Sequence, residues 1–129
     1  MATSIKQFNA GLKRALKDFR GDLSVVHRKI GLDILTGVVL KTPVDTGRAR
    51  GGWQASVETF NEDELGKEDK SGSSTISSGS TAIAKVRLGQ TIYIFNNVSY
   101  IVALEKGHSK QAPSGMLSRT LQEIGRGFK

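Results

Sequence analysis

The chain has 129 residues, enough for one domain, and 37% of them are hydrophobic while 24% are charged, which is typical of a globular protein. It contains no cysteine, which excludes disulfide bonds, thiolate metal sites and thiol catalysis. The formal net charge of +7 is unevenly distributed. Residues 1–50 carry ten basic and four acidic side chains, and residues 81–129 carry seven basic and two acidic ones. Residues 51–80, in contrast, carry two basic and six acidic side chains.

One long amphipathic helix is predicted over residues 4–40, with Ser4 as its N-cap. Four glycines weaken this helix by about 1 kcal/mol each relative to alanine. We therefore expect a bend or break near Gly21, where Asp22 can cap a second helix. The nearly continuous apolar stretch 31–40 should be the most buried end. Apolar residues recur at spacings of three and four and form one stripe: Ile5, Phe8, Leu12, Leu16, Phe19, Leu23, Val26 and Ile30.

A sharp corner is predicted where this helix meets Pro43. Thr42 precedes the proline and is pushed toward extended geometry, so the helix should end there. Asp45 or Thr46 can turn the chain by accepting a hydrogen bond from a backbone N–H two residues on. Gly47 can then adopt a positive φ, which a side chain resists. The predicted structural corner, which presents Arg48 and Arg50, consists of Pro43, Asp45, Thr46, Gly47 and Trp53.

Two strand regions and a loop are predicted after the corner. Residues 53–60 alternate in polarity as a half-buried strand does, with Trp53 as a core residue at its start. Residues 61–80 are acidic and then rich in Ser and Gly, and they carry too little apolar surface to order themselves. We expect them to be a flexible loop within a single domain spanning residues 1–129. Residues 82–88 and 91–95 should form a hairpin around a turn at Gly89-Gln90.

Two helices are predicted in the last third of the chain. Ser99 is placed to cap a short helix over residues 100–106, and Gly107 should end it. A polar loop, 108–114, leads to a final helix that runs to about Ile124. The order of elements predicts an α+β fold, in which helices pack a small antiparallel sheet.

The sequence lacks the patterns of catalytic and cofactor sites. It contains no G-x-S-x-G elbow, no phosphate-binding P-loop and no dinucleotide fingerprint. The clustered carboxylates of residues 61–80 lie on a segment expected to be flexible, whereas acid–base catalysis needs fixed geometry. His27 and His108 are far apart and lack partners at metal-ligand spacing. We expect no enzymatic activity, no catalytic residue, no cofactor and no metal. No apolar run approaches the ~18 residues that span a bilayer, and residues 1–14 lack the apolar core of a secretory signal.

Two segments of the chain resemble the neck and tail-completion proteins of long-tailed bacteriophages. Residues 42–53 read TPVDTGRARGGW, and residues 93–107 read YIFNNVSYIVALEKG. Members commonly pair such a corner with a later segment containing Asn, Tyr and Glu-x-Gly, and a proline-containing link then leads to the last helix. Ala49 stands where leucine is common, and Ile101 and Val102 replace smaller residues. The resemblance covers about residues 42–121.

The resemblance implies a structural virion protein, assembled in the host cytoplasm. It would be a ring subunit, expected to form a hexamer, at the neck or tail top, where it completes the tail or joins it to the head. Its partners would be copies of itself, adjacent neck and tail proteins, and genomic DNA contacted non-specifically in the channel; no membrane partner is expected. Glu105 either pairs or caps locally, or forms an ion pair with Arg48 or Arg50 that locks the two motifs together, as their pairing implies.

A small basic DNA-binding protein without enzymatic activity is the alternative. Its support is the net charge and a basic helical face, although no helix-turn-helix, zinc finger or basic zipper is present. Solvated basic side chains without a nucleic-acid partner explain the same charge. The residues expected to face DNA, in a channel or otherwise, are Lys13, Lys17 and Arg20 from the first helix, with Arg48 and Arg50 from the corner.

Overall fold

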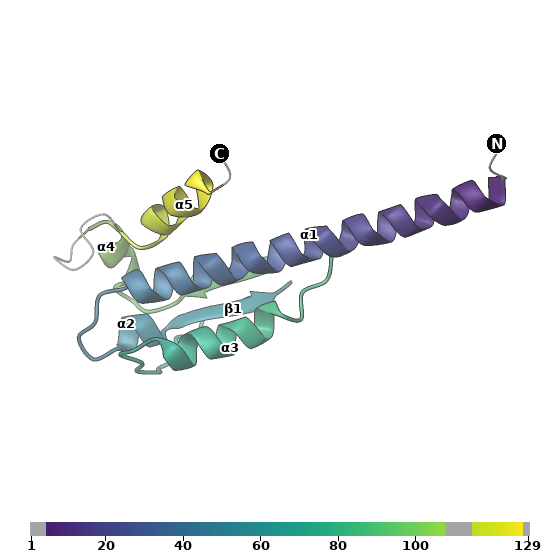
Figure 1. Cartoon of the computed structure of the whole chain (residues 1–129). Coiled ribbons are helices and arrows are strands. Elements are labelled where there is room, and N and C mark those ends of the chain that lie inside the picture. Colours follow the sequence, from purple (N-terminus) through teal and green to yellow (C-terminus); the bar gives the residue numbers. More distant parts are fainter. Residues whose placement is uncertain (1–4, 108–114, 128–129) are drawn as a thin grey trace.

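The structure is a computed structural model that describes residues 5–107 and 115–127 (Figure 1). Ser4, the predicted N-cap, and the predicted loop 108–114, which includes His108, lie outside the described residues. Helices and a small antiparallel sheet combine in an α+β fold, as predicted. The elements are α1 (Ile5–Lys41), α2 (Arg48–Gly51), β1 (Trp53–Val57), α3 (Ser73–Ile83), β2 (Ile92–Asn96), α4 (Ile101–Glu105) and α5 (Leu117–Arg126).

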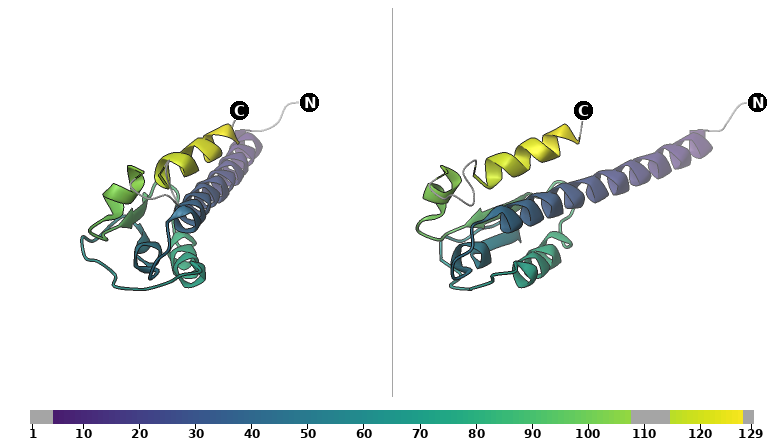
Figure 2. Two further views of the ribbon diagram at one scale, coloured as in Figure 1. Left: turned by 90° about the vertical axis from the view of Figure 1, so that its left-hand side faces the viewer. Right: turned by 60° about the vertical axis from the view of Figure 1, so that its left-hand side comes forward.

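Helix α1 is unbroken over 37 residues, so the bend or break expected near Gly21 is wrong. One exposed glycine costs a helix only about 1 kcal/mol, and the neighbouring Leu, Lys, Arg and Ala residues favour the helical state. The end of the helix at Lys41, before Thr42 and Pro43, is as predicted. Only the C-terminal part of α1 packs against other elements, and the N-terminal part projects beyond them (Figures 1 and 2).

The sheet has two strands, which pair antiparallel with Trp53 opposite Asn96 and Val57 opposite Ile92. Strands near residues 53–60 and 91–95 were predicted, but the hairpin between residues 82–88 and 91–95 is wrong. Ala82 and Ile83 end a helix instead, and the turn at Gly89 leads into β2, whose partner is the earlier strand β1. Alternation of polar and apolar residues in a short segment does not show that the segment is a strand, and it does not show which other strand would pair with it.

The predicted loop 61–80 is also partly wrong, because residues 73–80 belong to helix α3. This helix buries a narrow face of small residues, Thr75 and Gly79, together with Ile83. Gly79 permits this contact, since a Cβ there would lie 2.4 Å from Cδ2 of Leu35. Asp69 accepts hydrogen bonds from the backbone N–H groups of Gly72 (3.1 Å) and Thr75 (2.8 Å), which stabilises the start of the helix. A Ser- and Gly-rich segment can therefore be helical when a neighbour covers one face.

The hydrophobic core lies between α1, α3, the inner face of the sheet and the start of α5. Its buried members are Leu35, Val38, Val39, Trp53, Ile83 and Met116. Strand β2 contributes Ile92 and Ile94, which pack against this cluster, while the alternating residues Tyr93 and Phe95 point to the other face of the sheet. The most buried part of α1 is thus its C-terminal end, as the apolar stretch 31–40 predicted.

The two C-terminal helices are present as predicted, with shifted bounds. Helix α4 begins after Tyr100 without a side-chain cap, so the predicted capping role of Ser99 is wrong. Gly107 follows with φ 84°, the left-handed geometry expected of the residue that ends a helix. Helix α5 runs back along α1, on a different side of it from α3 (Figures 1 and 2). Among the described residues, no helix combines the length and apolar character that spanning a membrane requires.

Candidate functional site

The predicted corner is present and is fixed by backbone geometry. Gly47 has φ 90°, in the left-handed region that a side chain disfavours. The Thr46 hydroxyl oxygen accepts a hydrogen bond from the Arg48 N–H at 3.2 Å, whereas Asp45 is exposed. The Gly47 carbonyl accepts a hydrogen bond from the Asp69 N–H at 3.0 Å. The corner therefore packs directly on the backbone that leads into α3.

Trp53 joins the corner to the end of α1. Its side chain is buried, and its indole N–H donates to the Thr42 hydroxyl oxygen at 2.7 Å. That hydroxyl in turn donates to the Val38 carbonyl at 2.5 Å. Pro43 lies between Thr42 and the turn and is half-buried. Trp53 is thus a core residue, as predicted, and its one polar atom is satisfied within the core.

Arg50 caps the C-terminal end of α1. Its guanidinium donates to the carbonyls of Leu40 (3.0 Å), Thr42 (2.9 Å) and Lys70 (2.8 Å). Carbonyls at the end of a helix lack intrahelical partners and carry partial negative charge, so a cation there is stabilising. The structure therefore assigns Arg50 to internal hydrogen bonds and not to an ion pair with Glu105.

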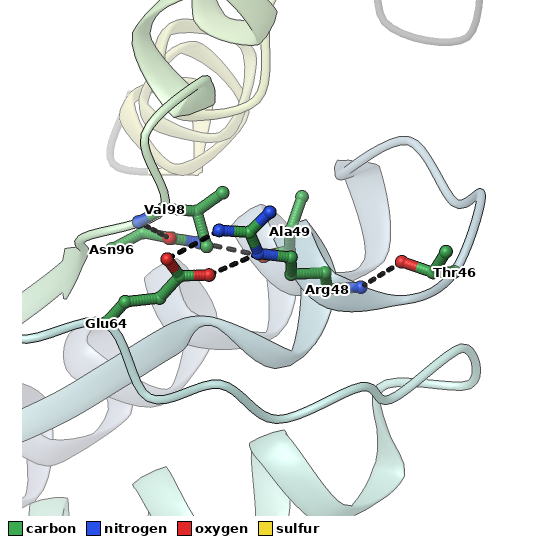
Figure 3. A network of polar contacts seen from close by, with 6 residues as sticks. All are labelled: Thr46, Arg48, Ala49, Glu64, Asn96 and Val98. Atoms are coloured by element: carbon green, nitrogen blue, oxygen red, sulfur yellow. Dashed lines mark hydrogen bonds and ion pairs between the residues drawn. The ribbon is translucent and has the colours of Figure 1, made fainter.

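Arg48 forms an ion pair with Glu64, as Figure 3 shows. The guanidinium contacts both carboxylate oxygens, with Nη2 2.6 Å from Oε2, and it lies over the Tyr100 ring at 5.5 Å from the centroid. The hydrogen bonds between the two side chains raise the pKa of Arg48 and lower the pKa of Glu64. The expected ion pair of Arg48 with Glu105 is wrong, because the loop before α3 brings a carboxylate closer to the corner.

Two asparagines at the end of β2 connect the corner to the second motif. Asn96 donates from Nδ2 to the Ala49 carbonyl at 2.8 Å, and its Oδ1 accepts from the Val98 N–H at 3.0 Å (Figure 3). Asn97 donates to the carbonyls of Asn61 (2.9 Å) and Asp63 (2.8 Å). The contact between the two motifs is therefore made by amide hydrogen bonds and by Arg48 over Tyr100.

Glu105 stabilises the start of α5. Its carboxylate accepts hydrogen bonds from the backbone N–H groups of Met116 (3.0 Å), Leu117 (2.8 Å) and Ser118 (3.1 Å), and from the Ser118 hydroxyl (2.9 Å). Burial favours the neutral acid, but these hydrogen bonds outweigh burial and lower the pKa of Glu105. Of the two roles considered for Glu105, the structure supports capping, at the N-terminal end of the next helix.

Because the pKa of Glu105 is lowered by folding, its carboxylate should stabilise the protein above the ordinary Glu pKa of about 4.3. We expect Glu105→Gln to lower the free energy of unfolding at pH 7 by about 1–2 kcal/mol. The difference from wild type should vanish as the pH falls from about 5 through the lowered pKa. Urea unfolding across this pH range measures the difference in the free energy of unfolding. The control is Glu68→Gln, because the Glu68 side chain is exposed. A difference that persists at low pH would contradict the capping role.

A hollow of about 640 Å³ lies at the corner, where the two motifs meet. Arg48 on its wall is paired with Glu64. No group of His, Cys, Asp and Glu within residues 5–107 and 115–127 could hold a metal ion. Its lining residues are Pro43, Val44, Asp45, Thr46, Gly47, Arg48, Ala49, Glu68, Tyr100 and Leu104.

The three helical residues expected to face DNA do not lie at the corner. Lys13, Lys17 and Arg20 are exposed on the projecting part of α1, and no ion pair joins them to another residue in the described part of the chain. Glu64, Asn96 and Asn97 form contacts at this site that were not predicted from the sequence. The only signal for the asparagines was their place in the second motif, and none marked Glu64 among the neighbouring carboxylates.

Comparison of the chain with protein-family models, curated proteins and solved structures found no match.

Proposed function

We propose that this protein is a structural subunit of a ring at the neck or tail top of a long-tailed bacteriophage, where it completes the tail or joins it to the head. The proposal starts from the resemblance of residues 42–53 and 93–107 to neck and tail-completion proteins. It involves no catalytic turnover, and it places the protein in the virion, in contact with its own copies and adjacent neck and tail proteins.

The observation that carries the proposal is that the two resembling segments form one structural unit. Asn96 of the second segment holds the Ala49 carbonyl of the first at 2.8 Å, and Arg48 lies over Tyr100. Trp53 of the first segment also pairs with Asn96 of the second across the two-stranded sheet.

Assembly through surface complementarity is the mechanism we propose. A ring needs heterologous contacts, in which one surface of each subunit meets a different surface of the next. The subunit offers separate candidate surfaces, because the projecting part of α1 lies far from the outer face of the sheet (Figures 1 and 2). The expected hexamer is one closed ring that such a repeated contact can form.

Non-specific DNA binding is the second candidate function. The observation that favours it is the exposure of Lys13, Lys17 and Arg20 on the projecting part of α1. The two arginines of the corner are less suited to bind DNA, because Arg48 is paired with Glu64 and Arg50 caps α1. In a ring, these helical residues would contact phosphates in the channel without reading bases.

Electron microscopy of the purified full-length protein, with sedimentation velocity, tests the proposal. We expect closed rings with a central channel. Under the second candidate function, DNA binding should be weak, independent of sequence and steeply salt-dependent, and Lys13→Ala/Lys17→Ala/Arg20→Ala should reduce the log–log salt slope by up to about 2.7. A monomer at all concentrations that binds one DNA sequence selectively at physiological salt would overturn the ring in favour of a DNA-binding regulator.

A further inference from the structure

The N-terminal part of α1 carries an apolar stripe that the described residues leave uncovered. The exposed fractions of Ile5, Phe8 and Phe19 are 80%, 64% and 60%. Residues 5–26, which we call the arm, span roughly 33 Å at the rise of an α-helix. A contiguous apolar surface of this length on a helix marks an interaction site. The stripe on the arm consists of Ile5, Phe8, Leu12, Leu16, Phe19, Leu23 and Val26.

The arm also has a basic flank. Lys6, Lys13, Lys17 and Arg20 each follow a stripe residue by one position, so they lie about 100° further round the helix, along one side of the stripe. All four are exposed. A surface that binds the arm should therefore be apolar at its centre and acidic along one border.

The outer face of the sheet has these properties. Phe60 packs against Tyr93 and Phe95, with ring centroids 5.0 Å and 6.1 Å apart, and it stays 58% exposed. Three exposed acidic residues lie on the same segment of chain as Phe60: Glu58, Glu62 and Asp63. We call these six residues the acidic aromatic patch.

The acidic aromatic patch is held in place by hydrogen bonds to the sheet. Asn61 donates to the Gln54 side chain at 3.3 Å, and Asn97 donates to the Asn61 and Asp63 carbonyls. The Thr91 N–H donates to the Glu58 carboxylate at 2.6 Å. A surface formed in advance in this way binds without the entropic loss of ordering a loop.

The arm cannot reach the patch of its own chain, because α1 is continuous and projects away from the sheet (Figures 1 and 2). We infer that the arm of one subunit docks on the acidic aromatic patch of a second copy, with its apolar stripe on the aromatic rings and its basic flank beside the carboxylates. This inference rests on the proposed ring and names the contact that builds it. It assigns Lys13, Lys17 and Arg20 to the neighbouring subunit, in place of the second candidate function, in which they contact DNA. Each copy presents both surfaces, so the contact repeats from subunit to subunit and closes if the rotation allows.

A charge-reversal exchange tests the pairing. Lys13→Glu/Lys17→Glu on the arm, or Glu62→Lys/Asp63→Lys on the patch, should each raise the concentration at which sedimentation velocity shows half-assembly by at least about tenfold. An equimolar mixture of the two variants should also assemble, because copies that alternate around an even-numbered ring satisfy every contact, and assembly should likewise recover when both sets of changes are combined in one chain. Failure of the combined variant to recover, with each partial variant impaired, would contradict the pairing.

Crosslinking provides an independent measurement, because the chain contains no cysteine. Lys17→Cys/Glu62→Cys, treated with a short bismaleimide, should give a ladder of covalent oligomers. The matched control is Lys17→Cys/Ser77→Cys, in which the second cysteine lies on the exposed side of α3 and should give no ladder. Covalent dimers from Lys17→Cys alone would show that arms pair with each other and would overturn the inference.

The two proposals fail in different ways. Rings that persist in both charge-reversed variants, without the expected ladder, would overturn the arm contact and leave the ring subunit intact. A wild-type protein that stays monomeric at 100 μM (roughly a hundredfold above a micromolar Kd) would overturn both. Arm-dependent binding to phosphatidylserine-containing vesicles, without the ladder, would assign the stripe to a membrane surface and also overturn the inference.

Discussion

Gly47→Ala should lower the free energy of unfolding by about 3–5 kcal/mol, whereas Gly89→Ala should lower it by only about 1–2 kcal/mol. The two glycines have nearly equal φ angles, 90° and 89°, so alanine meets the same backbone strain at both positions. They differ in their surroundings. A Cβ on Gly47 would lie 2.8 Å from the backbone nitrogens of Asp69 and Lys70, but nothing lies within 4 Å of one on Gly89.

Urea or thermal unfolding of the two variants measures this difference. The backbone of residues 69–70 has little freedom to move, because the Asp69 N–H donates to the Gly47 carbonyl and the Asp69 side chain caps α3. The excess loss at Gly47 therefore reports how firmly the corner and the start of α3 hold each other. Equal losses in the two variants would mean that this segment moves aside freely and that the corner is an ordinary turn.

Leu35→Ala should lower the free energy of unfolding by about 2–5 kcal/mol, and Leu12→Ala on the same helix should change it by less than about 0.5 kcal/mol. Leu35 is 0% exposed within the core, where it contacts Gly79 of α3, so its removal leaves a cavity. Leu12 is 50% exposed on the arm. Alanine there removes little buried surface and suits a helix slightly better than leucine.

The comparison uses protein dilute enough to be monomeric, so that docking of the arm does not add to the stability. The helicity of both variants, followed by circular dichroism, shows whether α1 stays folded. A loss of more than about 1 kcal/mol for Leu12→Ala in the monomer would show that the arm folds back onto its own chain, contrary to its exposed position in the structure.

Much of the fold could be predicted from local rules. The spacing of apolar residues indicated α1, and Thr42-Pro43 and Gly47 marked its end and the corner, because proline and glycine restrict the backbone independently of distant contacts. The alternation of residues 53–60 and the β-forming residues near 91–95 indicated both strands. The helix α3 was not predicted, since Ser, Gly and Thr favour a helix only weakly and their burial against Leu35 depends on a partner more than 40 positions earlier.

The candidate site, like the fold, was predicted in part from local rules. The sequence indicated which residues form the corner, but the ion pair that it suggested between Glu105 and Arg48 or Arg50 is wrong, and the alternative role of Glu105 as a cap is the one the structure shows. Every carboxylate attracts an arginine in principle, and only the placement of the chain decides which one comes close. Glu64 reaches Arg48 because Asn97 and Gln54 hold the loop against the sheet, and Glu105 meets the free N–H groups of α5 instead.

The sequence by itself therefore determined the helix period, the corner and the uneven charge, because these depend on neighbouring residues and on composition. The sequence also marked residues 31–40 as the most buried part of the helix, and only the tertiary structure decided that the apolar stripe before them is left exposed. From Ile5 to Ile30 the pattern is uniform, and nothing in its spacing distinguishes a core from an interface. The body of the protein buries α1 from Gly31 onward and leaves most of the arm exposed, since the short sheet and α3 do not extend along it and α5 comes close only to its end at Val26.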